Sequence, residues 1–116
     1  MSKTLLLVDD DLNIQDTARD ILEDAGFIVE TTGTVAGALE KLKVASIDVA
    51  LIDFNLPDGR GVDLATTAKQ LYPELMIILL TGEATPELGD AKHVIQAILT
   101  KPVEPSRLIE IIRKNS

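Results

Sequence analysis

Five mainly apolar segments, each four or five residues long, recur along the chain and are separated by longer segments of mixed polarity. They cover residues 4–8, 27–31, 49–52, 76–80 and 97–100. Short apolar runs that are bounded by turn-forming residues are typical of strands buried on both faces of a parallel sheet. The sequence therefore predicts five strands.

Between and after these runs, apolar residues recur at the spacing of amphipathic helices. Gly26 is suited to end the first helix, Thr34 to cap the second, and Pro73 to stop the third. A short helix is expected over residues 86–93, and the Pro- and Gly-rich residues 55–61 are expected to form a loop. The apolar helix positions are Ile14, Ala18, Ile21, Leu22 and Ala25; Val35, Ala38, Leu39 and Leu42; Leu64, Ala65, Ala68 and Leu71; and Leu108, Ile109 and Ile112.

Alternating strands and helices indicate the α/β class. Right-handed crossovers place helices on both faces of a parallel sheet, so we expect a doubly wound five-stranded sheet with five helices. The pattern ends with the fifth helix. We therefore expect a single domain over residues 1–116, without an output domain in this chain.

Composition narrows the classes of function. The formal net charge of −8, from 19 acidic and 11 basic residues, disfavours direct binding to nucleic acid, which needs clustered Lys and Arg. No apolar stretch approaches the roughly 20 residues that cross a bilayer, and no signal peptide is recognisable, so we expect no membrane contact and a cytoplasmic location. The absence of cysteine excludes disulfides and thiolate metal sites.

Charged and hydroxyl side chains stand where four of the apolar runs end. Asp9-Asp10-Asp11 follows the first run, Asp53 the third, Thr81 the fourth and Lys101 the fifth. In a parallel sheet these run-ends meet at one edge, where open α/β sheets place their binding sites. The expected edge carries carboxylates, a hydroxyl and an ammonium, which suit a divalent cation and a phosphoryl group.

Mg²⁺ fits this set because it prefers oxygen ligands and commonly joins one or two carboxylates to phosphate. We expect Asp10 and Asp53 as direct ligands, Asp9 as a ligand directly or through water, and the backbone carbonyl of Asn55 as a further ligand. Asp53 retains a free oxygen that can attack phosphorus. Lys101 is expected to neutralise the phosphoryl oxygens and Thr81 to donate a hydrogen bond to one of them.

The same residues lie in four motifs that occur in this order: Asp9-Asp10, LIDFNLPDGRG around Asp53, ILLTGE around Thr81, and LTKPVEP around Lys101. As a set they resemble the receiver domain of bacterial two-component response regulators, and the resemblance covers essentially the whole chain. It implies a flavodoxin-like receiver fold and a cis Lys101-Pro102 bond. Asp53 is then the phosphoacceptor, Asp9 and Asp10 the acidic pair, Thr81 the switch hydroxyl and Lys101 the phosphate-binding cation.

The resemblance also implies partners. The phosphoryl donor is expected to be a sensor histidine kinase or a phosphotransfer protein, and the output a downstream effector protein. Asn55 and Glu83 border the expected phosphoryl group, where polar side chains can orient a hydrolytic water. We expect a phosphoryl lifetime of the ordinary signalling type.

Two features depart from the family pattern. Family members usually carry Tyr, Phe or His three residues before the Lys, where this chain has Ile98. The interval of 20 residues from Thr81 to Lys101 is shorter than usual, so we expect the fourth helix to be trimmed or irregular.

Other interpretations stay open from sequence alone. Asp9-Asp10-Asp11 is also suited to cap a helix. Asp9-x-Asp11 resembles the signature of haloacid-dehalogenase phosphatases, in which the first Asp is the nucleophile and the second an acid. A degenerate receiver that acts as an unphosphorylated interaction domain is the third alternative.

Overall fold

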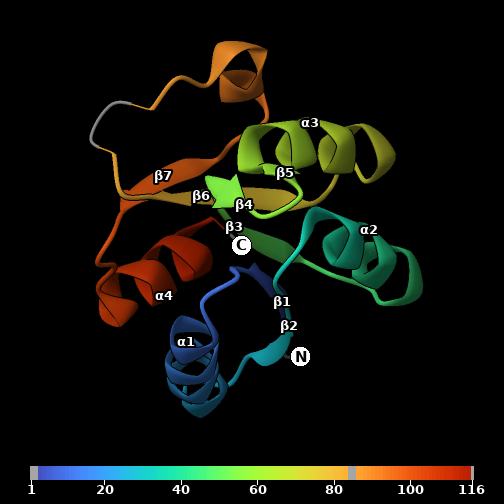
Figure 1. Cartoon of the computed structure of the whole chain (residues 1–116). Helices are drawn as coiled ribbons and strands as arrows, with labels where there is room; N and C mark the ends of the chain where they lie inside the picture. The colour runs from blue at the N-terminus through green and yellow to red at the C-terminus, as the bar shows by residue number, and fades with distance from the viewer. Residues whose placement is uncertain (1–2, 84–85, 116) are drawn as a thin grey trace.

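The computed structural model describes residues 3–83 and 86–115. Its centre is a five-stranded parallel sheet in the order β2-β1-β3-β6-β7 (Figure 1). The strands are β1 (Thr4–Val8), β2 (Ile28–Thr32), β3 (Val49–Asp53), β6 (Met76–Thr81) and β7 (Ala97–Thr100). All five predicted strands are confirmed, with ends that differ by no more than one residue. The interior strands are buried on both faces, which explains why their sequences are continuously apolar.

Helices cover both faces of the sheet, as the doubly wound prediction requires (Figure 1). α1 (Leu12–Asp24) and α4 (Pro105–Lys114) pack on one face, in a core that includes Leu22, Leu108 and Ile112. α2 (Val35–Val44), α3 (Gly61–Leu71) and the 3₁₀ helix η1 (Gly89–His93) cover the other face. Among the described residues, no helix has both the length and the apolar character needed to cross a membrane.

The predicted helix boundaries have the expected local causes. Gly26, just beyond α1, has a φ of 100°, a left-handed conformation that favours glycine. Thr34 caps α2, with its side chain accepting a hydrogen bond from the Gly37 amide at 2.9 Å. α3 ends at Leu71, before Pro73. The Lys101-Pro102 peptide bond is cis, as the family resemblance implied.

Two expectations need correction. The predicted helix over residues 86–93 is a 3₁₀ helix of five residues, so the described residues contain four α-helices rather than five. Gly89, the first residue of the 3₁₀ helix, has a left-handed φ of 56°, which a right-handed α-helix running through this residue does not allow. The predicted loop over residues 55–61 contains a small antiparallel hairpin of β4 (Asn55–Leu56) and β5 (Gly59–Arg60), with Pro57 and Asp58 at its tip.

The strand order positions the site. From β1 the chain adds β2 on one side of the sheet and then β3 on the other, so the direction of winding reverses between β1 and β3. Helices leave the two strands toward opposite faces, which opens a crevice at their carboxyl ends. Asp9 and Asp53 stand at this crevice.

Candidate functional site

Four strand ends bring the predicted site residues to one edge of the sheet. Asp9 directly follows β1, Asp53 is the last residue of β3, Thr81 is the last of β6, and Lys101 directly follows β7. The strands pair in register, with Val8 beside Ile52 and Thr81 beside Thr100. The expected convergence of the run-ends is therefore observed.

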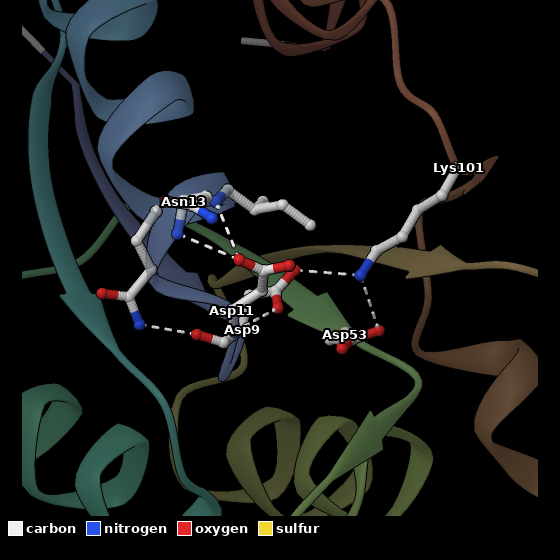
Figure 2. Close-up of polar contacts among 7 residues, drawn as sticks. Asp9, Asp11, Asn13, Asp53 and Lys101 are labelled. Atoms are coloured by element: carbon white, nitrogen blue, oxygen red, sulfur yellow. Dashed lines mark hydrogen bonds and ion pairs between the residues drawn. The ribbon is translucent and has the colours of Figure 1, made fainter.

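Lys101 joins two of the carboxylates. Its Nζ lies 2.9 Å from Oδ2 of Asp9 and 3.2 Å from Oδ1 of Asp53, and its side chain reaches across the edge between them (Figure 2). The Asp9 side chain is only 1% exposed and that of Asp53 13%. A buried carboxylate is stable only when it is paired or hydrogen-bonded, and Lys101 supplies a charge partner for both.

Asp10 completes an acidic cluster. Asp9, Asp10 and Asp53 each offer a carboxylate oxygen, and these oxygens all lie within 4.8 Å of one another. Asp10 is exposed whereas Asp9 is buried, so a cation held here would keep contact with solvent. Two or three carboxylate oxygens on an open edge fit Mg²⁺, which retains several of its waters when it binds to proteins.

Burial and charge act in opposite directions on the titration of the site. Burial raises the pKa of Asp53, and the nearby charge of Asp9 raises it too, while Lys101 and the backbone amide of Asn55 limit the rise. For Lys101, burial alone lowers the pKa. The hydrogen bond to Asp9 and the charges of Asp9 and Asp53 outweigh burial, so the net pKa is raised and the ammonium stays charged.

Asp9 is also held by α1. Its Oδ1 accepts a hydrogen bond from the Asp11 amide at 3.0 Å, and its backbone carbonyl accepts one from Nε2 of Gln15 at 2.6 Å. Sequence reasoning missed Gln15. Its signal was its position in the first turns of a helix that begins directly after the acidic run, where a long polar side chain can reach back to the strand end.

Asp11 has a different role from its two neighbours. Its Oδ1 accepts hydrogen bonds from the amides of Asn13 at 2.9 Å and Ile14 at 3.3 Å, which makes it the N-cap of α1 (Figure 2). The capping interpretation is thus correct for Asp11. These bonds give Asp11 a structural role at the start of α1 and use its Oδ1.

Thr81 and Asn55 adjoin the cluster without joining it through their side chains. Thr81 is buried, its Oγ1 accepts a hydrogen bond from the Glu83 amide at 3.0 Å, and its carbonyl accepts one from the Lys101 amide at 2.7 Å. Asn55 is exposed at the start of β4, two residues after Asp53. Within the described residues, no hydrogen bond connects either side chain to Asp9, Asp53 or Lys101.

Gly61 is a second residue whose contribution sequence reasoning missed, since the sequence predicts only a loop over residues 55–61. It begins α3, is buried, and donates its amide to the Phe54 carbonyl at 2.8 Å. A Cβ at this position would collide with the backbone carbonyl of Asp53. Only glycine allows α3 to approach the end of β3 so closely.

Ile98, the residue at the usual aromatic position, lies on β7 at the edge of the sheet and is 41% exposed.

Comparison with known proteins agrees with the geometry. The family model for the response regulator receiver domain matches residues 5–113. The chain is 30% identical to the chemotaxis protein CheY of Thermotoga maritima, over all of this chain and 99% of that protein. It is 32% identical to the aerobic respiration control sensor protein ArcB of Escherichia coli, over 95% of this chain but only 14% of that protein.

Among solved structures, a CheY-like response regulator receiver domain protein from Methanospirillum hungatei superposes with a TM-score of 0.93 at 35% identity, covering 99% of this chain and 94% of the other. The sheet order, the acidic strand ends and these matches agree. The chain belongs to the response regulator receiver domain family, the phosphoryl-accepting signalling modules of two-component systems.

Proposed function

We propose that this receiver accepts a phosphoryl group on Asp53 from a phosphohistidine of a sensor histidine kinase or phosphotransfer protein, in the presence of Mg²⁺. The observation that carries the proposal is the arrangement of Lys101, which contacts both Asp9 and Asp53 beside a cluster of three carboxylates. A phosphoryl acceptor needs a nucleophilic oxygen and nearby positive charge, and both occur here within contact distance.

The carboxylates fit a divalent cation. Asp10 and Asp53 are the proposed direct ligands, Asp9 a ligand directly or through water, and the Asn55 carbonyl a further one. Held by these residues, Mg²⁺ would supply the positive charge that offsets the repulsion between the carboxylates and an incoming phosphoryl group. The cluster carries three carboxylates against one ammonium, so it retains the excess negative charge that attracts such a cation.

The proposed transfer is an in-line displacement. An Asp53 carboxylate oxygen attacks phosphorus and forms the new P–O bond, while the P–N bond to the donor imidazole breaks and its electron pair remains on that nitrogen. Lys101 then turns from the Asp53 carboxylate to the phosphoryl oxygens. The Thr81 hydroxyl, whose oxygen accepts from the Glu83 amide, donates its own hydrogen to another phosphoryl oxygen, so positioning and charge supply most of the catalysis.

Hydrolysis ends the signal. Asn55 and Glu83 lie two residues beyond Asp53 and Thr81, and we propose that their polar side chains orient the attacking water. This supports a phosphoryl lifetime of the ordinary signalling type. An acyl phosphate that persists for many hours would be incompatible with this role.

The proposed output is contact with a downstream effector protein, in the cytoplasm and without direct binding to nucleic acid or membrane. The net charge of −8 supports the exclusion of nucleic acid. We further propose that residues 1–116 act as one receiver unit. In this role the chain is no enzyme for a separate substrate, since it catalyses only its own phosphorylation and dephosphorylation.

Intact-mass measurement after incubation with a small acyl-phosphate donor tests the proposal, with and without Mg²⁺. We expect one added phosphoryl group that requires Mg²⁺, is lost in Asp53→Asn, and is retained in the control Glu40→Gln, which removes an exposed carboxylate from α2. Labelling that survives in Asp53→Asn but not in Asp9→Asn would support the phosphatase-type nucleophile instead. A folded wild-type chain that accepts no group from this donor or from phosphohistidine would support an unphosphorylated interaction domain.

A further inference from the structure

The tip of the β4–β5 hairpin binds the N-terminus of α2. Asp58 Oδ1 accepts a hydrogen bond from the Val35 amide at 2.7 Å, and its Oδ2 accepts one from the Ala36 amide at 3.1 Å. The partners are 23 and 22 residues away in sequence. Both oxygens of one carboxylate are thus used to join two separate loops.

The local chemistry of α2 explains why this contact forms. The first amides of a helix lack partners within the helix, and the helix dipole favours an anion beside them. Thr34 satisfies the Gly37 amide with its own side chain, which leaves the amides of Val35 and Ala36 for Asp58. The interaction lowers the pKa of Asp58, chiefly through the bonds from Val35 and Ala36, so the carboxylate is charged at neutral pH.

The segment that receives Asp58 also touches the acidic strand end. The Asp9 amide donates to the Thr32 carbonyl at 3.0 Å, at the end of β2. Gly33 lies against the same place, since a Cβ built on it would be 3.4 Å from Cα of Asp10. Residues 32–35 therefore contact the Asp9–Asp10 loop at one end and Asp58 at the other.

The hairpin connects Asp58 to Asp53. Asn55 pairs with Arg60, and the Gly61 amide donates to the Phe54 carbonyl at 2.8 Å, which closes the hairpin directly after the phosphoacceptor position. Its tip packs closely on α2, because a Cβ built on Gly59 would lie 3.2 Å from Cγ2 of Val35. The Asp53–Asn55 segment is consequently held by β3 at one end and by the hairpin at the other.

We propose that Asp58 is a positioning residue for the cation site. It sets the separation between the Asp9–Asp10 loop and the Asp53–Asn55 segment without contacting the cation or the phosphoryl group. The inference rests on the proposed function, because it assumes that these two segments share one cation. Mg²⁺ demands near-ideal ligand geometry, so a looser hairpin weakens its binding even when all ligands are present.

Calorimetric titration with Mg²⁺ alone, together with thermal unfolding, tests this role on the whole chain. We expect Asp58→Ala to weaken Mg²⁺ binding by about tenfold, the lower end of the effect of residues that orient metal ligands. Asp58→Asn is expected to fall between Asp58→Ala and wild type, since an amide oxygen can still accept one of the two bonds. Thr34→Ala is the matched control, because it removes a cap from the same helix end but leaves the hairpin bonded.

The outcomes separate positioning from simple stabilisation. Thr34→Ala is expected to lower the Tm while leaving the Kd for Mg²⁺ unchanged. Equal Mg²⁺ affinity in wild type and Asp58→Ala, or equal losses of affinity in Asp58→Ala and Thr34→Ala, would overturn the inference and leave the proposed function intact. A wild-type chain that is phosphorylated only with Mg²⁺ supports the proposed function by itself, whereas a chain that binds no Mg²⁺ would overturn both.

Discussion

At the scale of single residues, Lys101 is the cation that offsets the negative charge of Asp9 and Asp53. Its ammonium serves the buried Asp9 and the partly buried Asp53 at once, at 2.9 and 3.2 Å. If either carboxylate is removed, Lys101 still has the other one as a partner. If Lys101 is removed, the two carboxylates face each other with less charge compensation. If Lys101 turns to a phosphoryl group, as we propose, Asp9 keeps its bond from the Asp11 amide.

Asp58 provides a pH-dependent prediction. Its pKa in the folded chain lies below the ordinary value of 3.8, so its bonds to α2 stabilise the fold at pH values above 3.8 and this contribution is lost as the pH falls through the folded-state pKa. Denaturant unfolding should show Asp58→Asn to be less stable than wild type at neutral pH. The difference should shrink as the pH is lowered below 3.8.

Glu40→Gln is the control for this pH series, because it removes an equal charge from an exposed position on α2, the helix that Asp58 binds. The stability of this variant should follow that of wild type across the pH range. A stability difference for Asp58→Asn that stays constant down to acid pH would show that the charge of Asp58 is not what binds α2.

At the scale of secondary-structure elements, the site depends on how closely α3 approaches β3. Gly61→Ala places a methyl group against the backbone carbonyl of Asp53, and backbone cannot move aside as a flexible side chain can. We expect this variant to lose about 1–3 kcal/mol of unfolding free energy, as is common for overpacked sites. Chemical denaturation measures the loss.

Gly82→Ala is the matched control, because a Cβ at that position meets nothing within 4 Å and its φ is not in the left-handed region. Its unfolding free energy should stay close to that of wild type. Equal stability of the two variants would mean that α3 can shift without cost, and that Gly61 does not constrain the Asp53 strand end.

The short connection between β6 and β7 is the element that departs most from the family pattern. The 3₁₀ helix η1 contributes Ala91 to the core that α2 and α3 share, so the segment is packed although it has lost its α-helical turns. β7 remains at the edge of the sheet with Ile98 half-exposed. The surface beside β7 therefore differs from that of a receiver with a full fourth helix and an aromatic residue.

At the scale of the whole molecule, the fold concentrates negative charge at one edge of a chain that already carries a net charge of −8. Binding of a cation to the folded state alone stabilises it, by about 2.7 kcal/mol at a concentration 100 times its Kd. We expect Mg²⁺ to raise the Tm of wild type by more than Na⁺ at equal ionic strength. Thermal unfolding of Asp53→Asn should show little of this specific gain, because a proposed ligand is lost.

The comparison with Na⁺ is needed because any salt screens repulsion among surface charges. Specific binding depends on the three carboxylates, whereas screening does not. An equal rise in Tm for wild type and Asp53→Asn would therefore indicate screening and argue against a Mg²⁺ site at this edge.

The sequence by itself determined the elements, the class of fold and the position of the site edge. Each of these depends on local information: the continuous apolar runs define buried strands, Gly26 and Thr34 mark helix ends, and polar residues at run-ends must meet when the strands are parallel. The trimmed fourth helix was also predictable, from the short interval before Lys101.

Only the tertiary structure decided which residue of the acidic run is buried, which is exposed and which caps a helix. It also decided which residues distant in sequence contact the site. Asp9, Asp10 and Asp11 are the same residue type, so the sequence does not distinguish them. In the connection from β1 to α1, however, Asp9 is buried, Asp10 is exposed and Asp11 is the N-cap of the helix. The bonds of Asp58 to α2 and of Lys101 to Asp9 join residues 22 to 92 positions apart. Such contacts follow from the packing of whole elements, so no local pattern of polar and apolar residues specifies them.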